Sequence, residues 1–233
     1  MQAHAWYPQI DDLARDLRVI AVDMPGHGQS DALDASAGLQ QFVQWAIDFI
    51  VALDIGPVNL AGHSMGLLIA SGVAVTRPDL VKRVAVLNGV YRRTAEARQA
   101  VLQRAAELRS GTIDVDTPLR RWFNDEEAQR VAARKVGSWL KSVDLQGYAT
   151  AYTAFAKGDE SYADGWHEIA CPALGRDLRV HVFRHLAGND RRVYLRRGGG
   201  DHRRGGCDAR DSDADRRVRL RTDSALSDQH HWP

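Results

Sequence analysis

The sequence predicts an α/β fold in which helices cover a parallel sheet, and three observations lead to this prediction. Strand-type apolar runs alternate with helical segments between residues 6 and 93. A Gly-x-Ser-x-Gly pentad, Gly62 to Gly66, stands between one such strand and the helix that follows it. The stretch over residues 94–167 has a helical pattern throughout, which indicates a helical insertion into the α/β core.

The first predicted elements are a helix, a strand and a second helix. Residues 6–15 predict a helix because their apolar side chains recur on one face. Residues 17–23 form a β-rich run that predicts a strand, and the turn-rich loop over residues 24–31 ends it. Ser36 is expected to be the N-cap of a helix over residues 37–53, whose apolar stripe would face the core.

The pentad is predicted to form a sharp turn between a strand and a helix. Residues 57–61 have the composition of a short strand, and residues 67–75 can continue as a buried helix. We expect that a Cβ at Gly62 or Gly66 would collide with the neighbouring backbone. Ser64 would then lie on a strained turn, with its hydroxyl exposed above the sheet.

The remaining elements extend the same pattern. Residues 81–87 predict another strand, and three helices are expected over residues 94–109, 125–143 and 145–157. Most aromatic side chains of this helical stretch are expected to be packing residues. As a group they indicate a helical lid over the edge of the sheet. Residues 172–174 have the pattern of a strand that returns to the sheet.

Composition and charge exclude several functions. The formal net charge of +1 requires no acidic partner, and no apolar run approaches membrane-spanning length. The N-terminus lacks the pattern of a signal peptide, so a cytoplasmic location is expected. Cys171 and Cys207 form no disulfide framework and no metal-ligand spacing, so we expect neither a metal nor another cofactor. A small-molecule substrate is the expected partner; the oligomeric state stays open.

Three stretches, residues 19–31, 58–66 and 169–174, together resemble the α/β-hydrolase fold superfamily, in its esterase, lactonase and C–C hydrolase branch. The resemblance covers about residues 6–174 and implies a parallel-sheet core with an inserted helical lid. In this superfamily the turn formed by the pentad, residues 62–66, is called the nucleophile elbow. The haloalkane dehalogenases have aspartate at the central position of this elbow, so Ser64 argues against their reaction. The resemblance also implies that the family's early strands precede this chain, as in an N-terminally truncated member.

The resemblance divides the chain into four parts. Residues 1–93 form a partial core with the nucleophile elbow, residues 94–167 form the helical lid, and residues 168–174 start a returning core strand. Residues 175–233 form a tail outside the family pattern, with fourteen arginines, nine aspartates and no lysine, glutamate, isoleucine or methionine. This composition predicts disorder. The aspartates, and the lack of interleaved aromatic residues, argue against nucleic-acid binding by this tail.

The composition of the tail also suggests a specific hypothesis. Arginine, glycine, aspartate, alanine and histidine without lysine or isoleucine are what GC-rich codons give in the wrong reading frame. We therefore hypothesise that residues from about 175 onward are translated out of frame. The nucleotide sequence read in all frames tests this, and the hypothesis is wrong if neither alternative frame continues a hydrolase-like pattern.

A serine hydroxyl is a poor nucleophile, so its chemistry requires an imidazole to accept its proton and a carboxylate to orient that imidazole. The resemblance implies that Ser64 is the nucleophile and that the Met65 N–H is one oxyanion donor. Asp177 and His202 follow in the order Ser, Asp, His and are the candidate acid and base. In the family, the second oxyanion donor comes from a loop that would precede this chain.

The predicted function is that of a serine hydrolase acting on a small ester, lactone or related carbonyl substrate. Three alternatives stay open. A C–C bond hydrolase of the same fold would use the same triad, and a catalytically dead fragment or pseudoenzyme would keep only the fold. A binding protein could use the Arg-rich tail on polyanions, which salt-sensitive retention on heparin would reveal.

Overall fold

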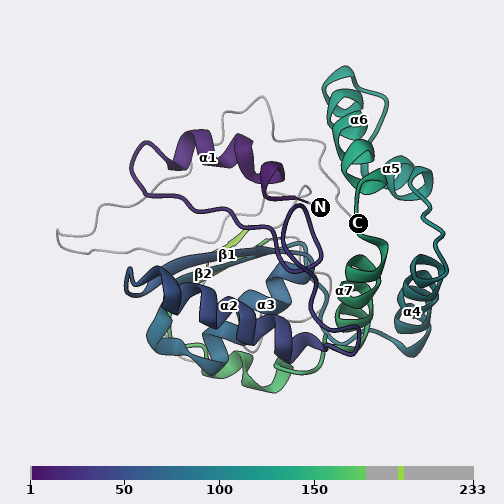
Figure 1. Ribbon diagram of the computed structural model, residues 1–233. Helices are drawn as coiled ribbons and strands as arrows, with labels where there is room; N and C mark the ends of the chain where they lie inside the picture. Colours follow the sequence, from purple (N-terminus) through teal and green to yellow (C-terminus); the bar gives the residue numbers. More distant parts are fainter. Residues whose placement is uncertain (1, 177–193, 197–233) are drawn as a thin grey trace, which may run out of the picture.

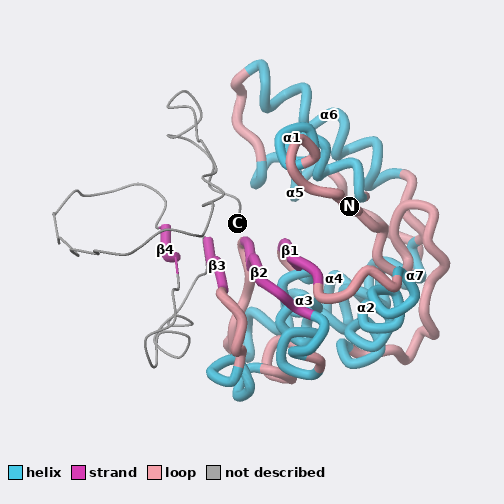
Figure 2. Tube along the Cα trace, turned by 90° about the vertical axis from the view of Figure 1, so that its left-hand side faces the viewer, coloured by secondary structure: helices cyan, strands magenta, loops and turns pink. Residues whose placement is uncertain are grey.

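The computed structural model describes residues 2–176 and 194–196, and in this part of the chain four parallel strands form one sheet (Figures 1 and 2). The strands are β1 (Val58–His63), β2 (Val81–Leu87), β3 (Ala173–Arg176) and β4 (Tyr194–Arg196). The helices, with η for a 3-10 helix, are η1 (Ala3–Trp6), α1 (Tyr7–Leu13), α2 (Leu39–Leu53), α3 (Met65–Thr76), η2 (Pro78–Leu80), α4 (Ala95–Arg109), α5 (Asp116–Trp122), α6 (Glu127–Lys141), α7 (Leu145–Lys157) and η3 (Ala163–Glu168).

The sheet has the strand order β1-β2-β3-β4, and every neighbouring pair is parallel. In register, Leu60 of β1 pairs with Val84 of β2, which pairs in turn with Ala173 of β3. Parallel strands need a crossover on a face of the sheet, and α3 provides the one between β1 and β2. The strand expected to return at residues 172–174 is β3.

The main core lies between the sheet, α3 and α2. Helix α3 packs against β1 and β2, and α2 packs against α3. Leu67 and Val73 of α3 are fully buried, and Phe42 and Val43 of α2 are 1% exposed. Because α3 is enclosed on nearly all sides, its sequence is apolar around the whole helix rather than along one stripe.

The strand predicted over residues 17–23 does not form. These residues have no regular secondary structure after a turn, and the described part of the chain gives them no ladder partner. Leu17, Ile20 and Val22 are 39–40% exposed. A strand exists only through hydrogen bonds to a neighbouring strand, so β propensity alone could not decide this segment.

The predicted cap of α2 was also wrong, by two residues. Gly38 is the N-cap, and the Gln41 side chain accepts a hydrogen bond from the Gly38 N–H at 2.9 Å. Ser36 instead donates its N–H and its hydroxyl to Oδ1 of Asp34, at 2.8 and 2.5 Å. Helix α2 therefore begins at Leu39.

The helical stretch contains one helix that the sequence pattern did not predict. Helix α5 is short and carries Pro118 in its first turn, where proline is tolerated. Asp114 marks its start, because Oδ1 of Asp114 accepts a hydrogen bond from the Thr117 N–H at 3.0 Å. None of the helices in the described part of the chain is long and apolar enough to span a membrane.

The stretch from α4 to α7 has a second, separate apolar cluster. Helices α4 and α7 pack side by side, whereas α5 and α6 stand apart from the sheet in both views (Figures 1 and 2). Its buried side chains come from α4, α6, α7 and the loop before α5, and partly buried Leu119 and Trp122 of α5 pack against them. Its buried members are Leu108, Val115, Val136, Leu140, Tyr148 and Ala149.

Candidate active site

Ser64 lies at the junction of β1 and α3, in a backbone conformation that side chains rarely adopt. Its φ is 55° and its ψ is −117°, so it is one of the non-glycine residues with positive φ. Two backbone hydrogen bonds hold it there: the Ser64 N–H donates to the Leu87 carbonyl and the Ser64 carbonyl accepts from the Leu67 N–H, each at 3.0 Å. Strain of this kind persists only where the surroundings enforce it, and it gathers at functional sites.

The two glycines of the pentad have different roles. A Cβ at Gly62 would lie 2.0 Å from the Gly66 carbonyl oxygen, so only glycine fits there, as predicted. The same expectation for Gly66 was wrong. Among the described residues, no heavy atom would lie within 4 Å of a Cβ at Gly66, outside its own helix and its chain neighbours. The tight contact of the turn therefore lies on the strand side alone.

Met65 is the first residue of α3. Its N–H therefore has no acceptor within the helix, and the positive end of the helix dipole lies at this point. The Met65 side chain is 6% exposed and belongs to the main core, which fixes the backbone of the turn. The geometry gives Ser64 a neighbouring N–H that can stabilise negative charge.

His63 precedes Ser64 at the end of β1. Its Nε2 lies 3.4 Å from Nδ2 of Asn88, which follows β2 and has a positive φ of 44°. Burial lowers the pKa of His63. Sequence reasoning missed this contact, although Asn88-Gly89 directly after a strand is a recognisable turn signal.

His27 lies in the loop over residues 24–31 and is 4% exposed. Its Nδ1 is 3.2 Å from the Pro25 carbonyl oxygen, and its ring meets Tyr148 of α7 edge to face, with 5.1 Å between the centroids. Burial, together with the charge of the N-terminal amino group, lowers the pKa of His27 to about 4. His27 is therefore neutral at pH 7.

The structure brings two of the four sequence-predicted site residues together. Ser64 and Met65 are consecutive on the turn, with the hydroxyl and the N–H at the same end of α3. Asp177 and His202 lie outside the described residues. Their assignment as acid and base stays a prediction.

Comparison with known proteins gives a consistent family. A family model described as the alpha/beta hydrolase fold matches residues 2–116. The chain is 62% identical over 174 residues to (E)-2-((N-methylformamido)methylene)succinate hydrolase of Acinetobacter baylyi, covering 75% of this chain and 66% of that protein. It is 30% identical over 157 residues to 3-oxoadipate enol-lactonase 1 of the same organism, covering 66% of this chain and 58% of the lactonase.

A solved structure agrees with the sequence relatives. The enol-lactonase from Burkholderia xenovorans LB400 is 28% identical and matches with a TM-score of 0.68, over 75% of this chain and 67% of that one. The chain spans less than two thirds of the length of the two Acinetobacter baylyi relatives named above.

Proposed function

Because this chain belongs to the α/β-hydrolase fold superfamily, we propose that it is a serine hydrolase in which Ser64 attacks the carbonyl carbon of a small substrate. The observation that carries the proposal is the positive φ of Ser64 at the turn from β1 into α3. A side chain held at this turn projects beyond the end of the strand, where a substrate can reach it.

In the proposed reaction, Oγ of Ser64 forms a bond to the carbonyl carbon and the carbonyl oxygen becomes an oxyanion. The Met65 N–H, at the positive end of α3, stabilises that charge as it develops. The hydroxyl proton passes to an imidazole, for which His202, oriented by Asp177, is the candidate. His27 is a poor base, because its pKa is about 4 and its Nδ1 lies beside the Pro25 carbonyl.

The names of the relatives support a substrate class. One relative is named for an N-formyl amide attached to a methylenesuccinate, and two are named enol-lactonases. We therefore propose (E)-2-((N-methylformamido)methylene)succinate as the first candidate substrate and small enol-lactones as the second. We also propose that residues 94–167 form a lid that sets specificity, since Tyr148 of α7 contacts His27 in the loop over residues 24–31.

Hydrolysis of these two substrates, followed by mass spectrometry, tests the proposal. We expect Ser64→Ala to lower the rate by at least about a thousandfold. Ser71→Ala is the matched control, because Ser71 lies in the same helix and its buried Oγ has no hydrogen-bond partner in the described part of the chain. Equal rates for Ser64→Ala and Ser71→Ala, or no turnover of either substrate by the unchanged protein, would contradict the proposal.

A further inference from the structure

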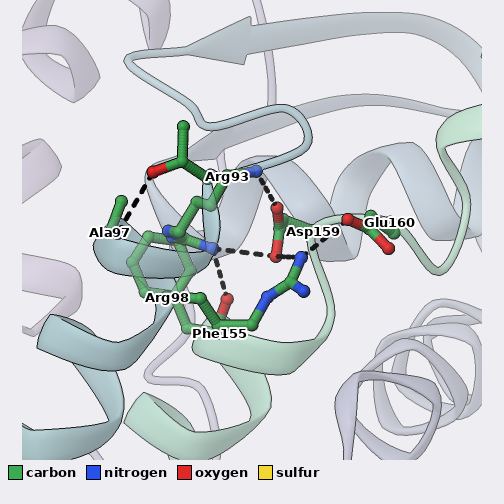
Figure 3. A network of polar contacts seen from close by, with 7 residues as sticks. Arg93, Ala97, Arg98, Phe155, Asp159 and Glu160 are labelled. Carbon is green, nitrogen blue, oxygen red and sulfur yellow. Dashed lines mark hydrogen bonds and ion pairs between the residues drawn. The ribbon is translucent and has the colours of Figure 1, made fainter.

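A buried carboxylate joins the two ends of the helical stretch. Asp159 follows α7 directly after Gly158, and its side chain is fully buried. Oδ2 of Asp159 accepts a hydrogen bond from the backbone N–H of Arg93, and Oδ1 lies 3.2 Å from Nη1 of Arg93 and 3.4 Å from Nη2 of Arg98 (Figure 3). Arg93 lies just before the N-cap of α4, so one side chain connects the segment that leads into α4 to the segment that follows α7.

The Arg93 guanidinium is enclosed almost as completely. Its side chain is 4% exposed, Nη1 donates to the Phe155 carbonyl at 2.7 Å, and its Cζ lies 3.9 Å from the Phe155 ring centroid (Figure 3). Burial lowers the pKa of Arg93, and Asp159 opposes this shift. Removing one partner of a buried ion pair leaves an uncompensated charge, so loss of the carboxylate charge should weaken the packing around Arg93.

Residues 88–94, the connecting segment, lead from this ion pair back to the elbow. Its first residue, Asn88, lies beside His63, and the Leu87 carbonyl just before it accepts the Ser64 N–H. At Gly89 a Cβ would lie 2.1 Å from the Leu67 side chain, so the segment lies tightly against α3. Only four residues, 89–92, separate Arg93 from Asn88, so a displacement at Arg93 can readily reach the residue that lies beside His63.

The connecting segment is also strained. Asn88 and Arg92 have positive φ values of 44° and 50° although neither is glycine. Conformations of this kind require contacts that hold them in place. At one end the elbow supplies them; at the other, the Asp159 carboxylate does.

We propose that Asp159 is a positioning residue for Ser64: by binding Arg93 and Arg98 it fixes the connecting segment, and the segment fixes the elbow. The inference rests on the proposed role of Ser64 as nucleophile. Asp159 itself needs no contact with the substrate.

The test compares Asp159→Asn with Asp164→Asn. Asparagine keeps the shape of aspartate and removes its charge. Asp164 is the matched control because it pairs with Arg92 of the same connecting segment, yet its side chain is 91% exposed. Both variants are treated with a fluorophosphonate over a range of concentrations, and amide exchange is measured at Arg93 and Ser64, well below the melting temperature.

We expect Asp159→Asn to lower the maximal rate of Ser64 labelling about tenfold, a size typical of coupling through packed contacts, with an unchanged half-saturating probe concentration. Exchange at the Arg93 and Ser64 amides should become faster together. Asp164→Asn should change each value less than about twofold, because exposed ion pairs contribute little. A purely structural role would leave the maximal labelling rate and the Ser64 amide unchanged.

The inference is overturned if Asp159→Asn alters only the Arg93 amide, or neither amide, or if Asp164→Asn has the same effect. If Asp159→Asn does not fold, Arg98→Gln replaces it, since Arg98 is 29% exposed and its loss leaves the Arg93 pair in place. For Arg98→Gln, a smaller decrease in the labelling rate together with faster exchange at both amides supports the inference. Unchanged labelling and exchange overturn it. If the unchanged protein is not labelled at Ser64, the proposed function fails, whereas the amide exchange still tests the connection between Asp159 and the elbow.

Discussion

The elbow and the helical stretch are held in place by different forces. Nine residues of α3 are buried, against two in the longer helix α4. The elbow is therefore fixed by apolar packing and by backbone hydrogen bonds around Ser64. The helical stretch depends on its separate apolar cluster and on the ion pair between Asp159 and Arg93. Substitutions should consequently act through packing and backbone geometry at the elbow, and through a few polar contacts in the helical stretch.

The largest effect is expected from Gly62→Ala, because the added Cβ would lie 2.0 Å from the Gly66 carbonyl oxygen. Overpacking against backbone cannot be relieved by a rotamer change, so we expect a loss of more than about 3 kcal/mol in the free energy of unfolding. Gly66→Ala is the matched control and should raise the free energy of unfolding by up to about 1 kcal/mol, since alanine favours a helix and its Cβ meets no described residue outside its own helix and its chain neighbours. Urea unfolding measures the stability of both variants. Equal losses of stability would refute the conclusion that the tight contact of the turn lies on the strand side alone.

The next effect concerns His27, which contacts the helical stretch through Tyr148. Its pKa is about 4 in the folded protein against 6.5 for the unperturbed group, so between these values the unfolded chain binds the proton and the folded protein does not. The free energy of unfolding should therefore fall by about 3 kcal/mol as the pH drops from 6.5 to 4. This contribution is fully present above pH 6.5.

Thermal melts between pH 4 and pH 7 measure this dependence. His27→Gln should flatten it, because glutamine does not titrate. His4→Gln is the matched control variant, because His4 is an exposed histidine near the N-terminus. A His27→Gln protein with the full pH dependence would show that another group is responsible.

The backbone conformation of Ser64 predicts a smaller effect, in which one substitution is more stable than another. Glycine adopts a φ of 55° without strain, whereas alanine does not. We therefore expect Ser64→Gly to be about 1 kcal/mol more stable than Ser64→Ala, both inactive. Calorimetry on the two variants measures this difference in stability. A more stable Ser64→Ala protein would show that the turn is not strained.

The smallest expected effect lies in the helical stretch. Oγ1 of Thr94 accepts a hydrogen bond from the Ala97 N–H at 3.2 Å and caps α4, so Thr94→Ala should cost about 1 kcal/mol. Ser36→Ala should cost less, because Gly38 and not Ser36 caps α2, and Ser36 binds the exposed Asp34 side chain. Urea midpoints compare the two, and a larger loss for Ser36→Ala would reverse the assignment of the caps.

Local patterns predicted the fold where local interactions decide it. Strand β2 and helix α7 have the bounds that apolar periodicity indicated, and Thr94 begins α4 as a cap residue should. Residues 17–23 failed because a strand requires a neighbour, which no local pattern reveals.

The candidate site divides in the same way. Ser64 and the Met65 N–H could be read from five consecutive residues. The contact of His63 with Asn88 joins residues 25 positions apart, and that of Arg93 with Asp159 joins residues 66 positions apart. Only the three-dimensional arrangement brings such pairs together.

The central claim is that Ser64 is the nucleophile, and covalent labelling tests it most directly. The protein is incubated with a fluorophosphonate and analysed by intact mass and peptide mapping. We predict one adduct, on Ser64, that is absent from Ser64→Ala and present in Ser71→Ala. An adduct of equal yield on the Ser64→Ala protein, or an adduct on a different residue of the unchanged protein, would contradict the claim.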